Sequence, residues 1–128
     1  VMNGDLLTNV NYEQMLNFHK SNKSFATMCV REYDVELPYG VVDLENQSVV
    51  SISEKPSKHF FVNAGIYLLD PDCIKLIPRD NFYDMPTLLT KIISGGKTVT
   101  SFPLNEYWID IGQKSDLKKA NIDYFTEF

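Results

Sequence analysis

The sequence predicts an α/β protein in which a layered sheet carries an inserted hairpin. Apolar runs typical of strands alternate with amphipathic stretches typical of helices along the chain. One short pair of runs separated by a turn indicates the hairpin. The predicted order is strand, helix, strand, two hairpin strands, strand, two helices, two strands and a final helix. No internal repeat or low-complexity segment interrupts it.

The first quarter of the chain contains a strand end, a helix and a buried strand. Val1–Asp5 is predicted to be a strand that closes on glycine and aspartate. Asn11–Asn22 has an apolar stripe at helical spacing, and its first residue suits a helix N-cap. Ser24–Arg31 is continuously apolar, which is typical of a strand covered on both faces, and Arg31–Asp34 is predicted to be its polar exit.

The middle of the chain contains the predicted hairpin. Val41–Leu44 and Val49–Ser53 are its two strands, expected at the edge of the main sheet or antiparallel to it. The proline that follows Lys55 favours an extended conformation for that lysine. Phe61–Leu69 is a second buried strand, and the glycine within it, Gly65, indicates a bulge or a close approach to the backbone.

The second half alternates helices with strands. A short helix is predicted from Asp70 to Ile77, and Met85–Ser94 is a longer helix that the following two glycines end. Lys97–Phe102 alternates as a strand. Glu106–Gly112 is predicted to be a strand with an acidic tip and a glycine turn, leading into a terminal helix over Gln113–Tyr124.

The composition is that of a folded globular domain. Hydrophobic residues make up 44% and charged residues 23% of the 128 residues, so one domain, or part of one, with a packed core is expected. The net charge of −5 argues against a nucleic-acid binder. No apolar run approaches the roughly 18 residues of a membrane span, and no signal peptide is recognisable. Cys29 and Cys73 lack metal-ligand spacing, so buried free thiols in a reducing cytoplasm are expected.

Two aspartates stand at predicted strand ends. Asp110 lies in an apolar stretch beside the only tryptophan, Trp108, and an ionised carboxylate is costly to bury without a cation or several donors. Asp5 follows a glycine in the first strand. If the two ends meet, Asp5 and Asp110 together would hold a metal ion, and Mg²⁺ favours one or two carboxylates with substrate phosphates. A plain Gly-Asp turn is the alternative reading.

Five short motifs occur in the order typical of one enzyme family. They are Asn3-Gly4-Asp5, Tyr39-Gly40-Val41-Val42, Glu54-Lys55-Pro56, Asn63-Ala64-Gly65-Ile66-Tyr67 and Trp108-Ile109-Asp110-Ile111-Gly112. Together they span nearly the whole chain. They make it resemble the sugar-1-phosphate nucleotidylyltransferases, or NDP-sugar pyrophosphorylases, of the glucose-1-phosphate thymidylyltransferase and mannose-1-phosphate guanylyltransferase type. The last motif is most similar to the guanylyltransferase-like branch.

This resemblance implies a Rossmann-like mixed α/β sheet and a transferase reaction. In the family reaction, a sugar phosphate oxygen attacks the α-phosphorus of a nucleoside triphosphate, which gives a nucleotide sugar and pyrophosphate. Such a transfer depends on positioning and charge neutralisation rather than on a protein nucleophile. The implied partners are a sugar 1-phosphate and a nucleoside triphosphate, with no nucleic acid and no membrane.

The family motifs imply a role for each matching residue. Asp5, Lys55 and Asp110 would be the catalytic residues, the two aspartates holding Mg²⁺ against the phosphates. Lys55 would bind the sugar phosphate as a point charge. Glu54 would accept hydrogen bonds from sugar hydroxyls.

Three further residues are implied to bind substrate. The backbone at Gly40 would approach the sugar closely, which only glycine permits. Asn63 would line the sugar pocket. Trp108 would pack beneath the site, and plain core packing is the alternative for this residue.

One family element has no match in this chain. The glycine-rich phosphate loop of the family precedes the Gly-Asp strand, and Gly95-Gly96 lacks its basic residues. The chain also begins with Val1-Met2-Asn3, which reads as a strand in progress. We therefore expect residues 1–128 to be the C-terminal portion of a nucleotidylyltransferase domain that lacks the N-terminal nucleotide-binding part, and to be inactive alone.

Two other functions remain open from the sequence. One is a non-catalytic module of the same fold that binds sugar phosphate, or that regulates or oligomerises with a partner subunit. An open sheet edge would favour such association, so a homo-oligomer is among the expected states. The other is a different metal-dependent glycosyltransferase-like fold, which accounts poorly for Glu54-Lys55-Pro56. The sequence decides neither the sugar nor the base.

Overall fold

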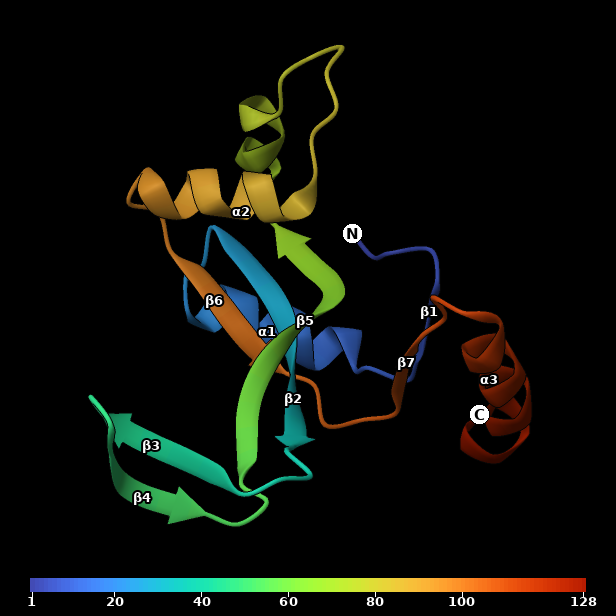
Figure 1. Ribbon diagram of the computed structural model, residues 1–128. Helices are drawn as coiled ribbons and strands as arrows, with labels where there is room; N and C mark the ends of the chain where they lie inside the picture. The colour runs from blue at the N-terminus through green and yellow to red at the C-terminus, as the bar shows by residue number, and fades with distance from the viewer. The chain divides into compact units, whose positions relative to one another are not determined.

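The computed structural model describes residues 1–128 and has an α/β architecture (Figure 1). The elements in chain order are β1 (Leu6–Thr8), α1 (Tyr12–Ser21), β2 (Ala26–Glu36), β3 (Val41–Glu45), β4 (Ser48–Ser53), β5 (Ser57–Leu69), the 3-10 helix η1 (Pro71–Leu76), α2 (Met85–Ser94), β6 (Val99–Pro103), β7 (Trp108–Asp110) and α3 (Lys114–Glu127). They form two compact units. The first comprises Val1–Arg31 and Asn63–Phe128, and the second comprises Glu32–Val62.

A three-stranded sheet in the order β5-β2-β6 organises the first unit. Strands β2 and β6 are parallel, with Ala26 opposite Val99. Met2 adds an antiparallel bridge to Ile66 of β5, so the sheet is mixed, as predicted. A separate antiparallel ribbon of β1 and β7 completes the first unit.

Two apolar clusters cover the two faces of the sheet. One contains Met15 of α1 with Ile66 of β5, and the other contains Leu88 of α2 with Tyr67 of β5. Because successive strand residues point to opposite faces, Ile66 and Tyr67 face different layers. Helices α1 and α2 therefore pack on opposite faces, which explains why the central strands read as continuously apolar.

The helix boundaries follow local capping chemistry. The side chain of Asn11 accepts a hydrogen bond of 2.9 Å from the Gln14 backbone, which confirms the predicted N-cap of α1. Helix α2 occupies the predicted range Met85–Ser94. Helix α3 begins at Lys114, where Asp116 accepts from the Gln113 backbone at 2.8 Å. None of the helices is long and apolar enough to cross a bilayer.

The predicted hairpin lies in the second unit. Strands β3 and β4 pair antiparallel, with Val41 opposite Ser53 and a bulge between Asp43 and Leu44. The expectation that this hairpin joins the main sheet is wrong, because β3 and β4 form a two-stranded sheet of their own.

Two predicted strand boundaries are also wrong. Strand β2 continues to Glu36, so Arg31–Asp34 is not an exit from the strand. Polar and apolar residues still alternate there, and alternation is sufficient for a strand that is exposed on one face. Near the N-terminus, Gly4 and Asp5 form a turn and β1 begins at Leu6. The aspartate therefore precedes a strand instead of ending one.

Both cysteines are buried free thiols, as predicted. Burial raises the pKa of the Cys29 thiol to about 11, and the negative charge of Glu106 adds to this increase. Burial also raises the pKa of Cys73. The thiolate is the reactive form, so the folded chain holds both cysteines in an unreactive state.

Replacing Leu88 by alanine tests the packing of α2 on the sheet. Leu88 is 1% exposed, whereas Ile93 on the same helix is 60% exposed. We expect Leu88→Ala to lower the free energy of unfolding by about 2–5 kcal/mol, from lost burial and a residual cavity. Ile93→Ala, the matched control, should change it by about 0.5 kcal/mol or less. Urea unfolding measures both, and equal effects would contradict the packing.

The pKa of Cys29 predicts an alkaline loss of stability. Between pH 9.0 and about 11 the unfolded thiol is ionised and the folded thiol is protonated. The unfolded state therefore binds fewer protons, and the free energy of unfolding falls as pH rises through this window. Urea midpoints at pH 8.5 and 10.5 should show a smaller decrease in Cys29→Ala than in the unchanged chain. A decrease of the same size in both would refute the assignment.

Candidate active site

The two predicted metal ligands lie at one end of the β1–β7 ribbon, Asp110 on β7 and Asp5 in the turn just before β1. Leu6 pairs with Asp110, and the Ile111 backbone N–H donates to the carbonyl of Asp5 at 2.8 Å. Asp5 and Asp110 therefore occupy neighbouring positions at one end of the ribbon, and both residues are exposed. Exposure keeps the carboxylates hydrated, so neither needs an internal counter-charge. The sequence leaves open whether the two segments meet, and in the structure they do.

Trp108 connects this ribbon to the main sheet. Its indole Nε1 donates to the carbonyl of Ala64 at 2.9 Å, and its ring packs against the apolar cluster of α1. The guanidinium of Arg31 lies 6.0 Å from the ring centroid and donates to the Glu106 carbonyl at 2.7 Å. Trp108 is thus held from two sides, and β7 with Asp110 is held with it.

The side chain of Asn63 is fixed by its own strand. Its Oδ1 accepts from the Gly65 backbone N–H at 2.9 Å, and its Nδ2 donates to the Tyr67 hydroxyl at 2.8 Å. The residue is exposed on the first unit. An amide has two donors and two acceptor lone pairs, so one of each is still free for a ligand.

Gly65 allows the N-terminal segment to lie against β5. Its φ is +73°, and a Cβ at this position would lie 2.7 Å from Nδ2 of Asn3. The Asn3 backbone N–H donates to the Gly65 carbonyl at 2.9 Å. The predicted close approach at this glycine is confirmed, and the approaching group is the Asn3-Gly4-Asp5 segment itself.

The second unit brings Gly40 and Glu54 together. Gly40 immediately precedes β3 and Glu54 immediately follows β4, so the hairpin register places them opposite each other. A Cβ at Gly40 would lie 3.2 Å from Oε2 of Glu54. The absence of a side chain at Gly40 therefore leaves room for this carboxylate.

Lys55 is held in an unusual backbone conformation. Its φ is +41°, in the left-handed region, whereas the sequence predicted an extended residue before Pro56. That prediction is wrong, because the chain must turn sharply between β4 and β5 at this point. Such a conformation costs about 1–2 kcal/mol for a residue with a Cβ. Strained residues of this kind cluster at functional sites, and the Lys55 side chain is exposed.

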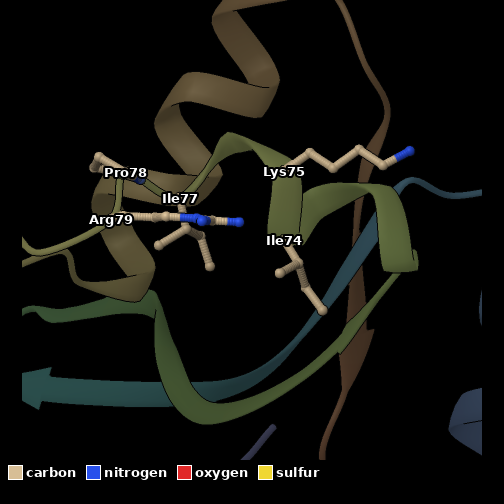
Figure 2. A pocket seen from close by; sticks show the side chains of 5 residues that line it. All are labelled: Ile74, Lys75, Ile77, Pro78 and Arg79. Atoms are coloured by element: carbon tan, nitrogen blue, oxygen red, sulfur yellow. The ribbon is translucent and has the colours of Figure 1, made fainter.

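A hollow elsewhere in the first unit is not lined by any predicted site residue. It has a volume of about 550 Å³ and is lined by residues of η1 and the following loop: Ile74, Lys75, Ile77, Pro78 and Arg79 (Figure 2). Lys75 points away from the other side chains and pairs with Asp72 at 2.7 Å. One of the two cations that line the hollow is therefore paired, and Arg79 is the other.

Sequence reasoning missed two residues that hold the site residues in place. Tyr67 and Arg31 contact Asn63 and Trp108, respectively. The sequence does contain an indication that Tyr67 contacts Asn63: the two residues are an even number of positions apart in one strand, which places them on the same face. Arg31 had no such signal, since its partner is far away in the sequence.

The family model described as nucleotidyl transferase matches residues 1–127 of this chain. The chain belongs to the nucleotidyl transferase family. A probable mannose-1-phosphate guanylyltransferase of Arabidopsis thaliana is 37% identical over 91% of this chain. A mannose-1-phosphate guanyltransferase of Debaryomyces hansenii is 30% identical over 98% of it. These alignments cover 36% of each relative's own length, so this nucleotidyl transferase chain spans about a third of those proteins.

A solved structure confirms the fold of this nucleotidyl transferase. HddC from Yersinia pseudotuberculosis superposes with a TM-score of 0.63 and 28% identity. The match covers 97% of this chain and 54% of the HddC chain. The Rossmann-like mixed α/β fold predicted from the motifs is therefore correct.

Substitution of Gly65 tests how the Asn3-Gly4-Asp5 segment is held. Gly65→Ala combines left-handed strain with a clash against Asn3, whereas Gly96→Ala has φ +74° and meets nothing within 4 Å. We expect about 1–2 kcal/mol of destabilisation for Gly96→Ala from strain alone. Gly65→Ala should cost clearly more. Urea unfolding compares the two, and equal losses would show that the Asn3 contact is loose.

Proposed function

We propose that the chain is part of a nucleotidyltransferase that joins a nucleoside triphosphate and a sugar 1-phosphate. The sugar phosphate oxygen forms a bond to the α-phosphorus, the bond to the β-phosphate oxygen breaks, and pyrophosphate leaves. The family match over residues 1–127 supports the reaction class. The observation that carries the assignment to this chain is the pairing of the Asp5 and Asp110 segments across the β1–β7 ribbon.

Asp5 and Asp110 are the proposed ligands of Mg²⁺. Two exposed carboxylates, one at the end of β7 and one in the turn just before β1, fit an ion that takes one or two carboxylates and leaves its other positions to water and phosphate oxygens. Bound there, Mg²⁺ would neutralise charge on the phosphates. The contacts of Trp108 with Ala64 and Arg31 would keep Asp110 at a constant position.

Gly40, Glu54 and Lys55 are the proposed sugar-phosphate residues. The ammonium of Lys55 would bind the phosphate, and Glu54 would accept hydrogen bonds from sugar hydroxyls. Two features of the backbone support this assignment: Gly40 approaches Glu54 closely, and Lys55 has a strained conformation. Unusual backbone geometry of this kind is often retained at functional sites. Asn63 would use its free amide donor and acceptor toward the sugar. Trp108 would support the site from the core side.

Calorimetry with a lysine pair tests the sugar-phosphate role. Mannose 1-phosphate and glucose 1-phosphate would be titrated into the chain in the presence of Mg²⁺, together with the corresponding nucleotide sugars. Lys55→Ala should weaken binding by about tenfold or more, the usual effect of losing a charge-assisted hydrogen bond. Lys58→Ala, an exposed lysine of β5, is the matched control and should bind normally. Equal losses in both variants would count against Lys55.

The same titration tests the metal role. Asp110→Asn keeps the shape of the side chain and removes its charge, so Mg²⁺-dependent binding of a nucleotide sugar should weaken. Asp116→Asn is not a suitable control, because Asp116 caps α3. Asp123→Asn also breaks a contact, to Tyr107. Asp80→Asn serves instead, because Asp80 is exposed and its left-handed backbone also suits asparagine, and its binding should match that of the unchanged chain.

A pyrophosphate-release assay separates catalysis from binding. We expect sugar-phosphate binding but no pyrophosphate release from residues 1–128 alone, since nothing in them matches the family's glycine-rich phosphate loop. Turnover by the purified chain would overturn this expectation.

A further inference from the structure

A histidine and two carboxylates converge on the second unit, outside all residues assigned above. Glu32 and Asp34 lie two positions apart on β2 and therefore point to the same face of the strand. His59 lies on β5, the neighbouring strand in the sheet. Its Nδ1 is 2.5 Å from Oδ1 of Asp34 and 3.9 Å from Oε1 of Glu32. One ligand atom from each residue lies within 4.8 Å of the other two.

We propose that Glu32, Asp34 and His59 form a binding site for a divalent transition-metal ion of the Zn²⁺ type. Two ligand atoms that each lie about 2.1 Å from one zinc ion are at most about 4.2 Å apart. The separations of His59 from both carboxylates already satisfy this bound. The side chains of the three residues are 57–67% exposed, so small χ rotations can close the triangle around an ion without moving the strands.

The chemistry of the three ligands selects the class of metal. An imidazole nitrogen with two carboxylates suits Zn²⁺, Co²⁺ or Mn²⁺, whereas Mg²⁺ and Ca²⁺ take oxygen ligands almost exclusively. The two carboxylates balance the charge of a divalent ion. The remaining coordination positions face solvent and would hold water. This site would therefore not compete for the Mg²⁺ proposed at Asp5 and Asp110.

The lysine next to His59, Lys58, does not face the proposed metal site. Lys58 is adjacent to His59 in sequence, but successive side chains on a strand point to opposite faces. Without a metal, His59 and Asp34 form an exposed hydrogen-bonded pair, and exposed pairs of this kind add little to stability. Displacing so weak a contact costs a bound ion little affinity.

Calorimetry with Zn²⁺ in millimolar Mg²⁺ tests the site. We expect one Zn²⁺ to bind per chain, and His59→Ala to weaken binding by at least about tenfold, since even outer-shell substitutions have effects of about 10–100-fold. The isosteric pair Glu32→Gln and Asp34→Asn should also weaken it. His19→Gln is the matched control, because the only other histidine bonds to Thr27 within the first unit and should not contribute. Circular dichroism verifies that each variant is folded.

A second readout distinguishes ligation from nonspecific association. Co²⁺ in place of Zn²⁺ gives visible d–d absorption that reports nitrogen and oxygen ligands directly. This spectrum should appear in the unchanged chain and in His19→Gln, and should be lost in folded His59→Ala. No saturable Zn²⁺ binding, or binding that is unchanged in His59→Ala or in the carboxylate variants, would overturn the proposal.

Discussion

The contact between Gly65 and Asn3 determines where the N-terminal segment lies. Only a residue without a Cβ permits the side chain of Asn3 to lie against β5, and the positive φ of Gly65 turns its carbonyl toward the Asn3 backbone. After Asn3, Gly4 and Asp5 form a turn, and the chain enters β1 at Leu6; the only strand partner of β1 is β7. The ribbon that carries Asp5 and Asp110 therefore depends on one glycine in the middle of a strand. The Trp108–Ala64 hydrogen bond fixes the other strand of the ribbon to the residue beside that glycine.

In the second unit, the register of the β3–β4 hairpin determines where the proposed sugar-phosphate residues lie. Antiparallel pairing of β3 with β4 determines that the residues flanking the hairpin, Gly40 and Glu54, oppose each other. The chain must then reverse into β5, and the turn forces Lys55 into a left-handed conformation before a proline. A lysine in an ordinary extended position would not incur this strain. That the chain retains this strain fits a lysine whose side chain is needed at one particular position.

The sequence was most informative where local chemistry decides structure. The cap at Asn11 and the range of α2 were predicted because capping groups and apolar periodicity act within a few residues. The sequence leaves open whether the ends that carry Asp5 and Asp110 meet, and the pairing of β1 with β7 brings these two segments together.

The predictions that are wrong concern residues whose conformation is decided by contacts with distant parts of the chain. The extended conformation predicted for Lys55 was overridden by the reversal between two strands. The polar residues after Arg31 predict an exit from the strand, but pairing with a neighbouring strand continues β2 to Glu36. The predicted boundaries also hide the Glu32, Asp34 and His59 cluster, because the predicted strands end at Arg31 and begin at Phe61, whereas β2 continues to Glu36 and β5 begins at Ser57. Contacts such as Arg31 with Trp108 join residues too far apart in sequence for any local pattern to reveal.

The chain has a single tryptophan, and it lies two residues before Asp110. Its indole is half-buried, hydrogen-bonded through Nε1 and covered by a guanidinium. Intrinsic fluorescence excited at the indole therefore reports on one place in the molecule, the attachment of β7 to β5. Any event that separates those strands, or that moves Arg31 off the ring, would change the polarity around the fluorophore and shift its emission. The protein thus contains a built-in optical probe of the segment that carries one of its two proposed metal ligands.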